Sequence, residues 1–195
     1  MPTMQVGLAI TGASGVRVGL KILDYLAGSG YTVHTVISEG AYRVFEAEDG
    51  LSREQVRRIV QSKAILYGEH DFTSPLASSS SVPRTFIIAP ASMKTIAALA
   101  HGYASNLVVR AAHAVLRLRG RLVVAPRETP LSLIDIENMA RLARAGAVVV
   151  PLCVGFYNRP ETVDDIVDFL AGKILDAAGI DNNLYRRWSD ARSSL

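Results

Sequence analysis

The fold is decided by the apolar run Gln5-Val6-Gly7-Leu8-Ala9-Ile10-Thr11 and the turn that follows it, Gly12-Ala13-Ser14-Gly15. Residues 16–28, which come next, have the apolar spacing of a helix. A strand, a glycine-rich turn and a helix in this order begin a βαβ unit. The free N–H groups at the start of such a helix, with the positive end of its dipole, suit a phosphate, although an ordinary tight turn explains the pattern as well.

Four further apolar runs follow, each succeeded by a helical pattern. They cover residues 31–37, 85–89, 122–125 and 147–151. Nearly every run is apolar throughout, which is typical of parallel strands covered on both faces. The helical patterns cover residues 16–28, 39–48, 52–65, 92–103, 105–119, 132–145 and 162–178. We therefore predict an α/β protein with a Rossmann-like three-layer fold and a central, mostly parallel sheet.

Length and composition limit the classes open to the chain. With 195 residues it is long enough to form one domain without a metal or disulfide. We expect residues 180–195 to be a polar tail that is partly disordered except near Trp188. The net charge of +3 is too small to indicate nucleic-acid binding. With no apolar segment of about 18 residues and no signal-peptide pattern, we expect a cytoplasmic protein that has no membrane partner.

The cysteine and histidine content argues against a metal centre. The single cysteine, Cys153, cannot form a disulfide within the chain. The four histidines show no metal-ligand spacing with one another or with this cysteine, so we expect no metal site. We expect Cys153 to be a small buried residue and His34 to be a packing residue in a strand.

Hydroxyl side chains follow three of the predicted strands. Ser14 lies in the first turn, Ser38 ends the second strand, and Ser92 and Thr95 follow the third. Because the carboxyl ends of parallel strands share one edge of the sheet, these hydroxyls could all donate to one ligand. Serine is also a common helix cap, so capping is the alternative. The first turn lacks the full dinucleotide fingerprint, so the set favours a mononucleotide pocket.

A pair of charged residues directly follows a predicted buried strand. Arg127 and Glu128 come after the apolar run at residues 122–125. Charges at the end of an inner strand are costly unless they contact a ligand or each other. A guanidinium suits a phosphate and a neighbouring carboxylate suits proton transfer, so this pair is a candidate for function.

Several motifs occur in one order along the chain. They are Thr11-Gly12-Ala13-Ser14-Gly15, Ser38, Ala89-Pro90-Ala91-Ser92-Met93-Lys94-Thr95, Pro126-Arg127-Glu128-Thr129-Pro130-Leu131-Ser132, Glu137-Asn138-Met139, Ala145-Gly146-Ala147-Val148 and Gly155-Phe156-Tyr157-Asn158-Arg159-Pro160. With these motifs the chain resembles the UbiX/Pad flavin prenyltransferase family over about residues 4–188. The blocks that begin at Pro126 and Gly155 are, together, the most specific part of the resemblance.

The resemblance implies an FMN site and a prenyl-phosphate site. In the FMN-binding domain, residues 1–179, the flavin would be held by Gly12, Ala13, Ser14, Ser38, Ser92, Met93, Lys94, Thr95 and Arg127. The prenyl phosphate would be bound by Tyr157, Lys173, Arg117 and Arg127, and Trp188 in the tail would close the site. Glu128, Ser14 and Glu48 would be catalytic, with Glu128 handling protons.

The reaction implied by the resemblance joins a dimethylallyl group, from dimethylallyl (di)phosphate, to N5 and C6 of reduced FMN without a metal. Prenylated FMN would then serve a UbiD-type decarboxylase, and the family assembles as trimers grouped into dodecamers. An FMN-dependent decarboxylase and a non-catalytic flavin carrier of the same fold are the alternatives. The chain departs from the family pattern at Ala91, which would lie beside the flavin, and at Ser79, Ser105, His113 and Arg117.

Overall fold

One six-stranded sheet forms the centre of the protein, in a computed structural model that describes residues 4–188. The strands are β1 (Gln5–Ile10), β2 (Thr32–Ile37), β3 (Ile65–Tyr67), β4 (Thr85–Ala91), β5 (Arg121–Pro126) and β6 (Val148–Val149). Their order is β3-β2-β1-β4-β5-β6, and all neighbouring strands are parallel. This is the strand order of doubly wound nucleotide-binding folds, so the predicted Rossmann-like fold is confirmed.

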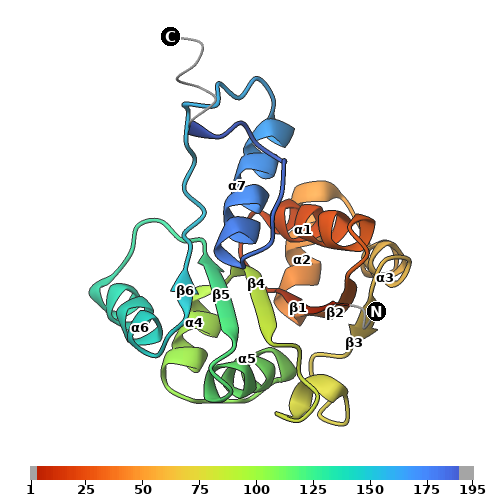
Figure 1. The fold of residues 1–195 in the computed structure, drawn as a ribbon, viewed down its shortest axis with the longest axis vertical. Coiled ribbons are helices and arrows are strands. Elements are labelled where there is room, and N and C mark those ends of the chain that lie inside the picture. Colours follow the sequence, from red (N-terminus) through yellow and green to blue (C-terminus); the bar gives the residue numbers. More distant parts are fainter. Residues whose placement is uncertain (1–3, 189–195) are drawn as a thin grey trace.

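Helices cover both faces of the sheet (Figure 1). They are α1 (Val16–Gly28), α2 (Glu39–Asp49), α3 (Arg53–Gln61), α4 (Met93–Ala100), α5 (Leu107–Arg117), α6 (Leu133–Arg144) and α7 (Val163–Ala177), with a 3-10 turn at Pro75–Ala77. One apolar core lies between the sheet and α1, α2, α3 and α7, and a second lies between the sheet and α4, α5 and α6. Within residues 4–188, no helix is long and apolar enough to cross a membrane.

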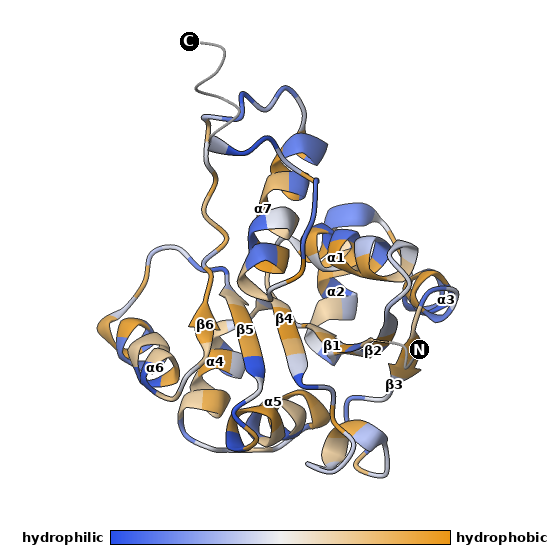
Figure 2. Ribbon diagram, in the orientation of Figure 1, coloured by the Kyte–Doolittle hydropathy of each residue, from blue (hydrophilic) through white to orange (hydrophobic). Residues whose placement is uncertain are grey.

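Alternation along the strands divides their side chains between the two cores. In β1, Leu8 belongs to the first core and Ala9 to the second, and in β4 the same holds for Ile87 and Ile88. All four are fully buried. Successive side chains of a strand point to opposite faces, so a sheet covered on both sides needs continuous apolar runs. Figure 2 shows this apolar character along β4 and β5.

The structure differs from the sequence prediction near β3. A helix was predicted over residues 52–65, but α3 ends at Gln61, and Ile65–Tyr67 pairs with β2 as an additional edge strand. Three residues are too few to give a readable alternation. Cys153 was expected to be buried and is exposed instead, because it lies beyond β6 in the segment that leads away from the sheet.

The last described segment, residues 180–188, runs back along α7 (Figure 1). Gly179 ends α7 with a φ of 72°, a left-handed conformation that glycine adopts without steric cost. The predicted disorder is therefore wrong for the part of this segment that precedes Trp188, where Asn182 hydrogen bonds to Gly172 and Asp176 of α7. The rest of the predicted tail, residues 189–195, lies outside the described residues.

Helix α6 presents apolar side chains outward. Leu133 and Ile134 are each 69% exposed and Ile136 is 50% exposed, while the buried positions of this helix include the polar Asn138. Figure 2 shows α6 at the edge of the molecule, with apolar and polar residues mixed along the ribbon. Although Leu142 of the same helix packs in the second core, a helix on the surface of a monomer normally exposes fewer large apolar side chains.

The buried histidine of β2 should make the stability of the fold depend on pH. His34 Nδ1 lies 2.9 Å from the hydroxyl of Tyr67, Nε2 is buried without a partner among residues 4–188, and burial lowers the imidazole pKa from its usual 6.5. The unfolded chain then binds a proton that the folded chain does not, so stability should fall as the pH drops below 6.5. Urea unfolding midpoints between pH 8 and pH 5 should fall less in His34→Phe than in the unmodified protein, whereas His70→Gln, at an exposed histidine, should change nothing.

Candidate active site

A cavity of about 350 Å³ lies at the carboxyl ends of β1, β2, β4 and β5. Its lining is Gly12, Ser38, Gly40, Glu69, Ser92, Met93, Lys94, Thr95 and Glu128. All of these except Gly40 and Glu69 belong to the candidate site residues predicted from the sequence. The structure therefore brings seven of the predicted residues to one place, at the point where the direction of the strand order reverses.

Two glycines let the first two turns approach closely enough to form one wall of the cavity. A Cβ atom on Gly12 would lie 3.0 Å from Cα of Gly40, and one on Gly40 would lie 3.3 Å from Cα of Gly12. Any larger residue at these positions would push the two backbones apart. Gly40 was not predicted, because nothing in the sequence indicates which backbone segment faces the first turn.

Thr11 connects the turn after β1 to the turn after β4. Its side chain is buried, its hydroxyl donates to the carbonyl of Pro90 at 2.9 Å, and its oxygen accepts from the N–H of Ser92 at 2.8 Å. One hydroxyl thus holds two walls of the cavity at a fixed distance. This explains why a polar residue ends an otherwise apolar strand.

The predicted hydroxyls cap helices that begin at the cavity. Ser38 Oγ accepts from the N–H of Ala41 at 3.2 Å, and Ser92 Oγ accepts from that of Thr95 at 3.4 Å. The hydroxyls of Ser92 and Thr95 lie 3.0 Å apart, so one of them donates to the other. A capping hydroxyl uses its oxygen and keeps its hydrogen for a ligand, so capping and ligand binding are compatible here. The first turns of α2 and α4 add backbone N–H groups.

The start of α1 is occupied by a carboxylate of the chain itself. Glu48 Oε2, at the end of α2, accepts from the N–H of Gly15 at 3.0 Å, and Arg17 forms an ion pair with Asp49. The sequence suggested that this helix start could bind a phosphate. In the structure Glu48 contacts the glycine-rich turn, and it takes one of the N–H groups that a phosphate would need. The first N–H of α2, that of Glu39, likewise donates to the carboxylate of Glu69 at 2.7 Å. The start of α4 is therefore the better anion site.

Arg127 and Glu128 lie at the end of β5 beside the cavity. Glu128 lines it, and Glu128 Oε1 accepts from the N–H of Thr129 at 3.0 Å. Arg127 Nη1 is 4.0 Å from that oxygen, while its Nε is buried and has no hydrogen-bond partner within residues 4–188. A buried guanidinium N–H without an acceptor is costly. Together with the hydroxyls and helix starts, it makes the residues present a good fit for the phosphate of a mononucleotide such as FMN.

A second group of predicted residues, Tyr157, Lys173 and Trp188, comes together around α7. The rings of Tyr157 and Trp188 meet edge to face with centroids 5.3 Å apart, and Tyr157 also meets Phe169 at 5.7 Å. Lys173 Nζ lies 5.7 Å from the ring centroid of Tyr185, which in turn contacts Phe169. This aromatic cluster (Tyr157, Phe169, Tyr185 and Trp188) with its lysine does not line the cavity described above.

Three other predicted residues lie outside both groups. Ala13 is buried and Ser14 half-buried in the first turn, next to Gly12. Arg117 ends α5, four residues before β5 begins, so it lies at the opposite edge of the sheet from the cavity. Ala91, expected beside the flavin, is fully buried and packs in the second core, directly before Ser92 of the cavity lining.

Glu69 is the functional candidate that sequence reasoning missed. Its carboxylate lines the cavity, accepting from the N–H of Glu39 at 2.7 Å and from Asn106 Nδ2 at 2.8 Å. It lies two residues after the end of the short strand β3, which the sequence pattern did not predict. Recognising Ile65-Leu66-Tyr67 as a strand would have placed Glu69 at the same sheet edge. No group of three or more histidine, cysteine or acidic side chains that could hold a metal occurs among the described residues.

The fold and the cavity define the class, a doubly wound α/β protein with a mononucleotide-type site at the switch point. The Flavoprotein family profile matches residues 1–175. Flavin prenyltransferase UbiX of Methanothermobacter thermautotrophicus is 42% identical over 182 residues, which are 93% of this chain and 94% of that protein. The chain belongs to the UbiX flavin prenyltransferase family.

Two solved structures extend this similarity to three dimensions. A crystal structure of AnUbiX in complex with FMN and dimethylallyl pyrophosphate has a TM-score of 0.90 and 33% identity, covering 95% of this chain and 97% of that one. A dodecameric FMN-dependent UbiX-like decarboxylase from Escherichia coli O157:H7 has a TM-score of 0.88 and 38% identity, covering 95% and 99%. The fold is thus shared over nearly the whole of each chain.

Proposed function

We propose that this chain is a flavin prenyltransferase that uses dimethylallyl phosphate or diphosphate as prenyl donor and FMN as acceptor. The observation that carries the proposal is the cavity where the hydroxyl-capped starts of α2 and α4 meet Glu128, with the unpaired Nε of Arg127 beside it. The AnUbiX complex with FMN and dimethylallyl pyrophosphate supports it. When bound in its reduced form, FMN supplies the N5 and C6 atoms that receive the prenyl group.

The side chains of the cavity bind the flavin phosphate and handle protons. Ser38 donates its hydroxyl to the phosphate, as does whichever of Ser92 and Thr95 does not donate to the other. The first-turn N–H groups of α2 and α4 that have no acceptor within the chain add to them. Arg127 donates the N–H that now lacks an acceptor. Glu128 accepts and returns a proton at its carboxylate, held in place by the N–H of Thr129.

The aromatic cluster on α7 and its lysine bind the prenyl phosphate. Lys173 and the hydroxyl of Tyr157 stabilise the phosphate as its bond to the allylic carbon breaks. The rings of Tyr157 and Trp188 exclude water from the developing allylic cation. A role for Arg117 in the same contact requires a neighbouring copy of the chain, because Arg117 lies at the opposite sheet edge of its own copy.

Assembly and product transfer complete the proposal. The chain forms trimers grouped into a dodecamer, an arrangement supported by the exposed apolar side chains of α6 and by the dodecameric relative from Escherichia coli. Its product, prenylated FMN, passes to a UbiD-type decarboxylase.

A mass measurement tests the function. Purified protein is incubated with reduced FMN and either dimethylallyl phosphate or dimethylallyl diphosphate, and the flavin is released and weighed by mass spectrometry. We expect the flavin to gain one dimethylallyl unit with at least one donor, and the two arms identify which. Bound but unmodified FMN, in conditions where the Methanothermobacter relative works, would instead favour a flavin carrier.

A further inference from the structure

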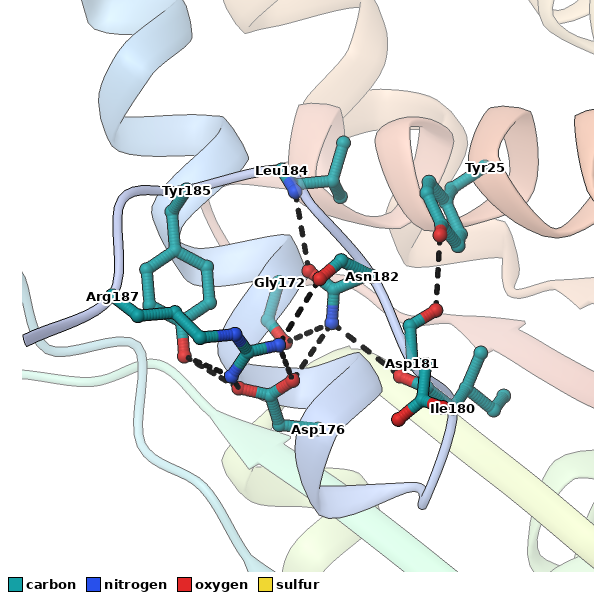
Figure 3. Close-up of polar contacts among 9 residues, drawn as sticks. All are labelled: Tyr25, Gly172, Asp176, Ile180, Asp181, Asn182, Leu184, Tyr185 and Arg187. Atoms are coloured by element: carbon teal, nitrogen blue, oxygen red, sulfur yellow. Dashed lines mark hydrogen bonds and ion pairs between the residues drawn. The ribbon is translucent and has the colours of Figure 1, made fainter. Parts of the chain in front are cut away.

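Most of the side-chain hydrogen bonds between residues 180–188 and α7 meet at one carboxylate, that of Asp176. Asp176 accepts two parallel hydrogen bonds from Arg187, at 2.9 Å to Oδ1 and 3.0 Å to Oδ2, and it also accepts from the hydroxyl of Tyr185. Asn182 Nδ2 donates to Asp176 Oδ1 at 2.8 Å and to the carbonyl of Gly172 at 3.1 Å. Figure 3 shows these side chains converging on Asp176. We name this network, Asp176, Asn182, Tyr185 and Arg187, the tail clasp.

The backbone of α7 is shaped to receive the same segment. A Cβ atom on Gly172 would lie 2.4 Å from Cδ1 of Tyr185, so the tyrosine ring can lie against the helix only because this position is glycine. Partial burial of Asp176 would raise the pKa of its carboxyl, but the hydrogen bonds from Arg187 and Tyr185 outweigh it and lower that pKa. The carboxylate is therefore held in the charged form that the clasp uses.

The clasp contacts the residues that bind the prenyl phosphate in the proposed function. Tyr185 lies edge to face against Phe169, with centroids 5.3 Å apart, and its ring is also the one that Lys173 approaches. Trp188 directly follows Arg187 and contacts Tyr157. One ion pair thus places two parts of the proposed site, the ring beneath the lysine and the ring beside Tyr157.

We propose that Asp176 and Arg187 are positioning residues for the prenyl-phosphate site. Their bidentate pair holds the tail against α7, so that Tyr185 orients Lys173 and Trp188 packs against Tyr157. This inference depends on the proposed function for the identity of the substrate, although the docking of the tail does not. The pair is partly exposed, 44% for Arg187 and 26% for Asp176, so losing it should release the tail and leave the rest of the fold in place.

Trp188 reports on this docking directly, since it is the only tryptophan of the chain. In Arg187→Ala and Asp176→Asn, acrylamide should quench its fluorescence more strongly and its anisotropy should fall. Arg187→Lys keeps the charge but loses the two parallel hydrogen bonds. Its quenching and anisotropy should lie between those of the unmodified protein and those of Arg187→Ala. Exchanging the partners, Asp176→Arg with Arg187→Asp, should restore part of the protection. Asp24→Asn, which removes an exposed carboxylate paired with Lys63, is the matched control and should change nothing.

Kinetics then separate positioning from a purely structural role. In Arg187→Ala the KM for the prenyl phosphate should rise about ten-fold or more, since small displacements of binding groups are costly, while FMN affinity and the thermal unfolding midpoint stay unchanged. Unchanged quenching of Trp188 overturns the inference whatever the enzyme activity. So does an equal loss of FMN and donor binding, or a fall in kcat alone. Should the unmodified protein transfer no prenyl group, the proposed function fails, and the quenching data still decide whether the clasp holds the tail.

Discussion

Glu128→Gln is expected to leave FMN bound and to slow prenyl transfer at least ten-fold, since proton transfer by a positioned side chain typically contributes about 10²–10⁴-fold. The amide oxygen of glutamine can still accept from the N–H of Thr129, so the side chain should keep its place in the cavity. Only its ability to take up and return a proton is removed. The measurement is the rate of flavin prenylation by mass spectrometry, with FMN binding followed separately by flavin fluorescence.

Glu46→Gln is the matched control for that experiment. Glu46 is exposed on α2 and does not line the cavity, so this variant should transfer the prenyl group at the normal rate. Normal turnover in Glu128→Gln would show that another group handles the proton. Loss of FMN in the same variant would assign Glu128 to cofactor binding.

Lys173→Ala is expected to weaken the prenyl phosphate and to spare FMN. A hydrogen bond to a charged group is worth about 1.5–3 kcal/mol, so the KM for the donor should rise about ten- to a hundred-fold. FMN affinity should not change, because Lys173 does not line the cavity where the flavin phosphate is placed. Lys173→Arg should restore most of the affinity. Steady-state kinetics with varied donor and a separate FMN titration give the two quantities.

The control for the lysine is Lys63→Ala, which removes an exposed lysine that pairs with Asp24. This variant should leave the KM for the prenyl donor and the affinity for FMN unchanged. An equal loss of FMN and donor binding in Lys173→Ala would contradict the division of the site into two groups.

Much of the fold could be read from the sequence because the strands are buried on both faces. Continuous apolar runs such as those of β1 and β5 predict a parallel sheet. The sheet in turn places Ser38 and Ser92 at one edge. The strand β3 could not be predicted, because three residues are too few to show a periodicity. Without that strand, nothing in the sequence placed Glu69 at the cavity.

Contacts between distant segments could not be read in the same way. The bond from Gly15 to Glu48 joins residues 33 positions apart, and no local pattern marks either partner. The tail looked disordered because its polar side chains suit solvent, yet Asn182 and Arg187 find their acceptor in Asp176. A polar composition therefore predicts a solvent-exposed segment only where its side chains have no hydrogen-bond partner elsewhere in the fold.

The outward apolar face of α6 has a consequence for the life of the chain before assembly. Leu133, Ile134 and Ile136 are exposed in a single folded copy. A newly made copy therefore carries a surface that attracts other apolar surfaces. If copies associate through this face, as proposed above, the yield of folded protein in a cell depends on how fast copies find one another, and so on the rate of synthesis and the supply of chaperones.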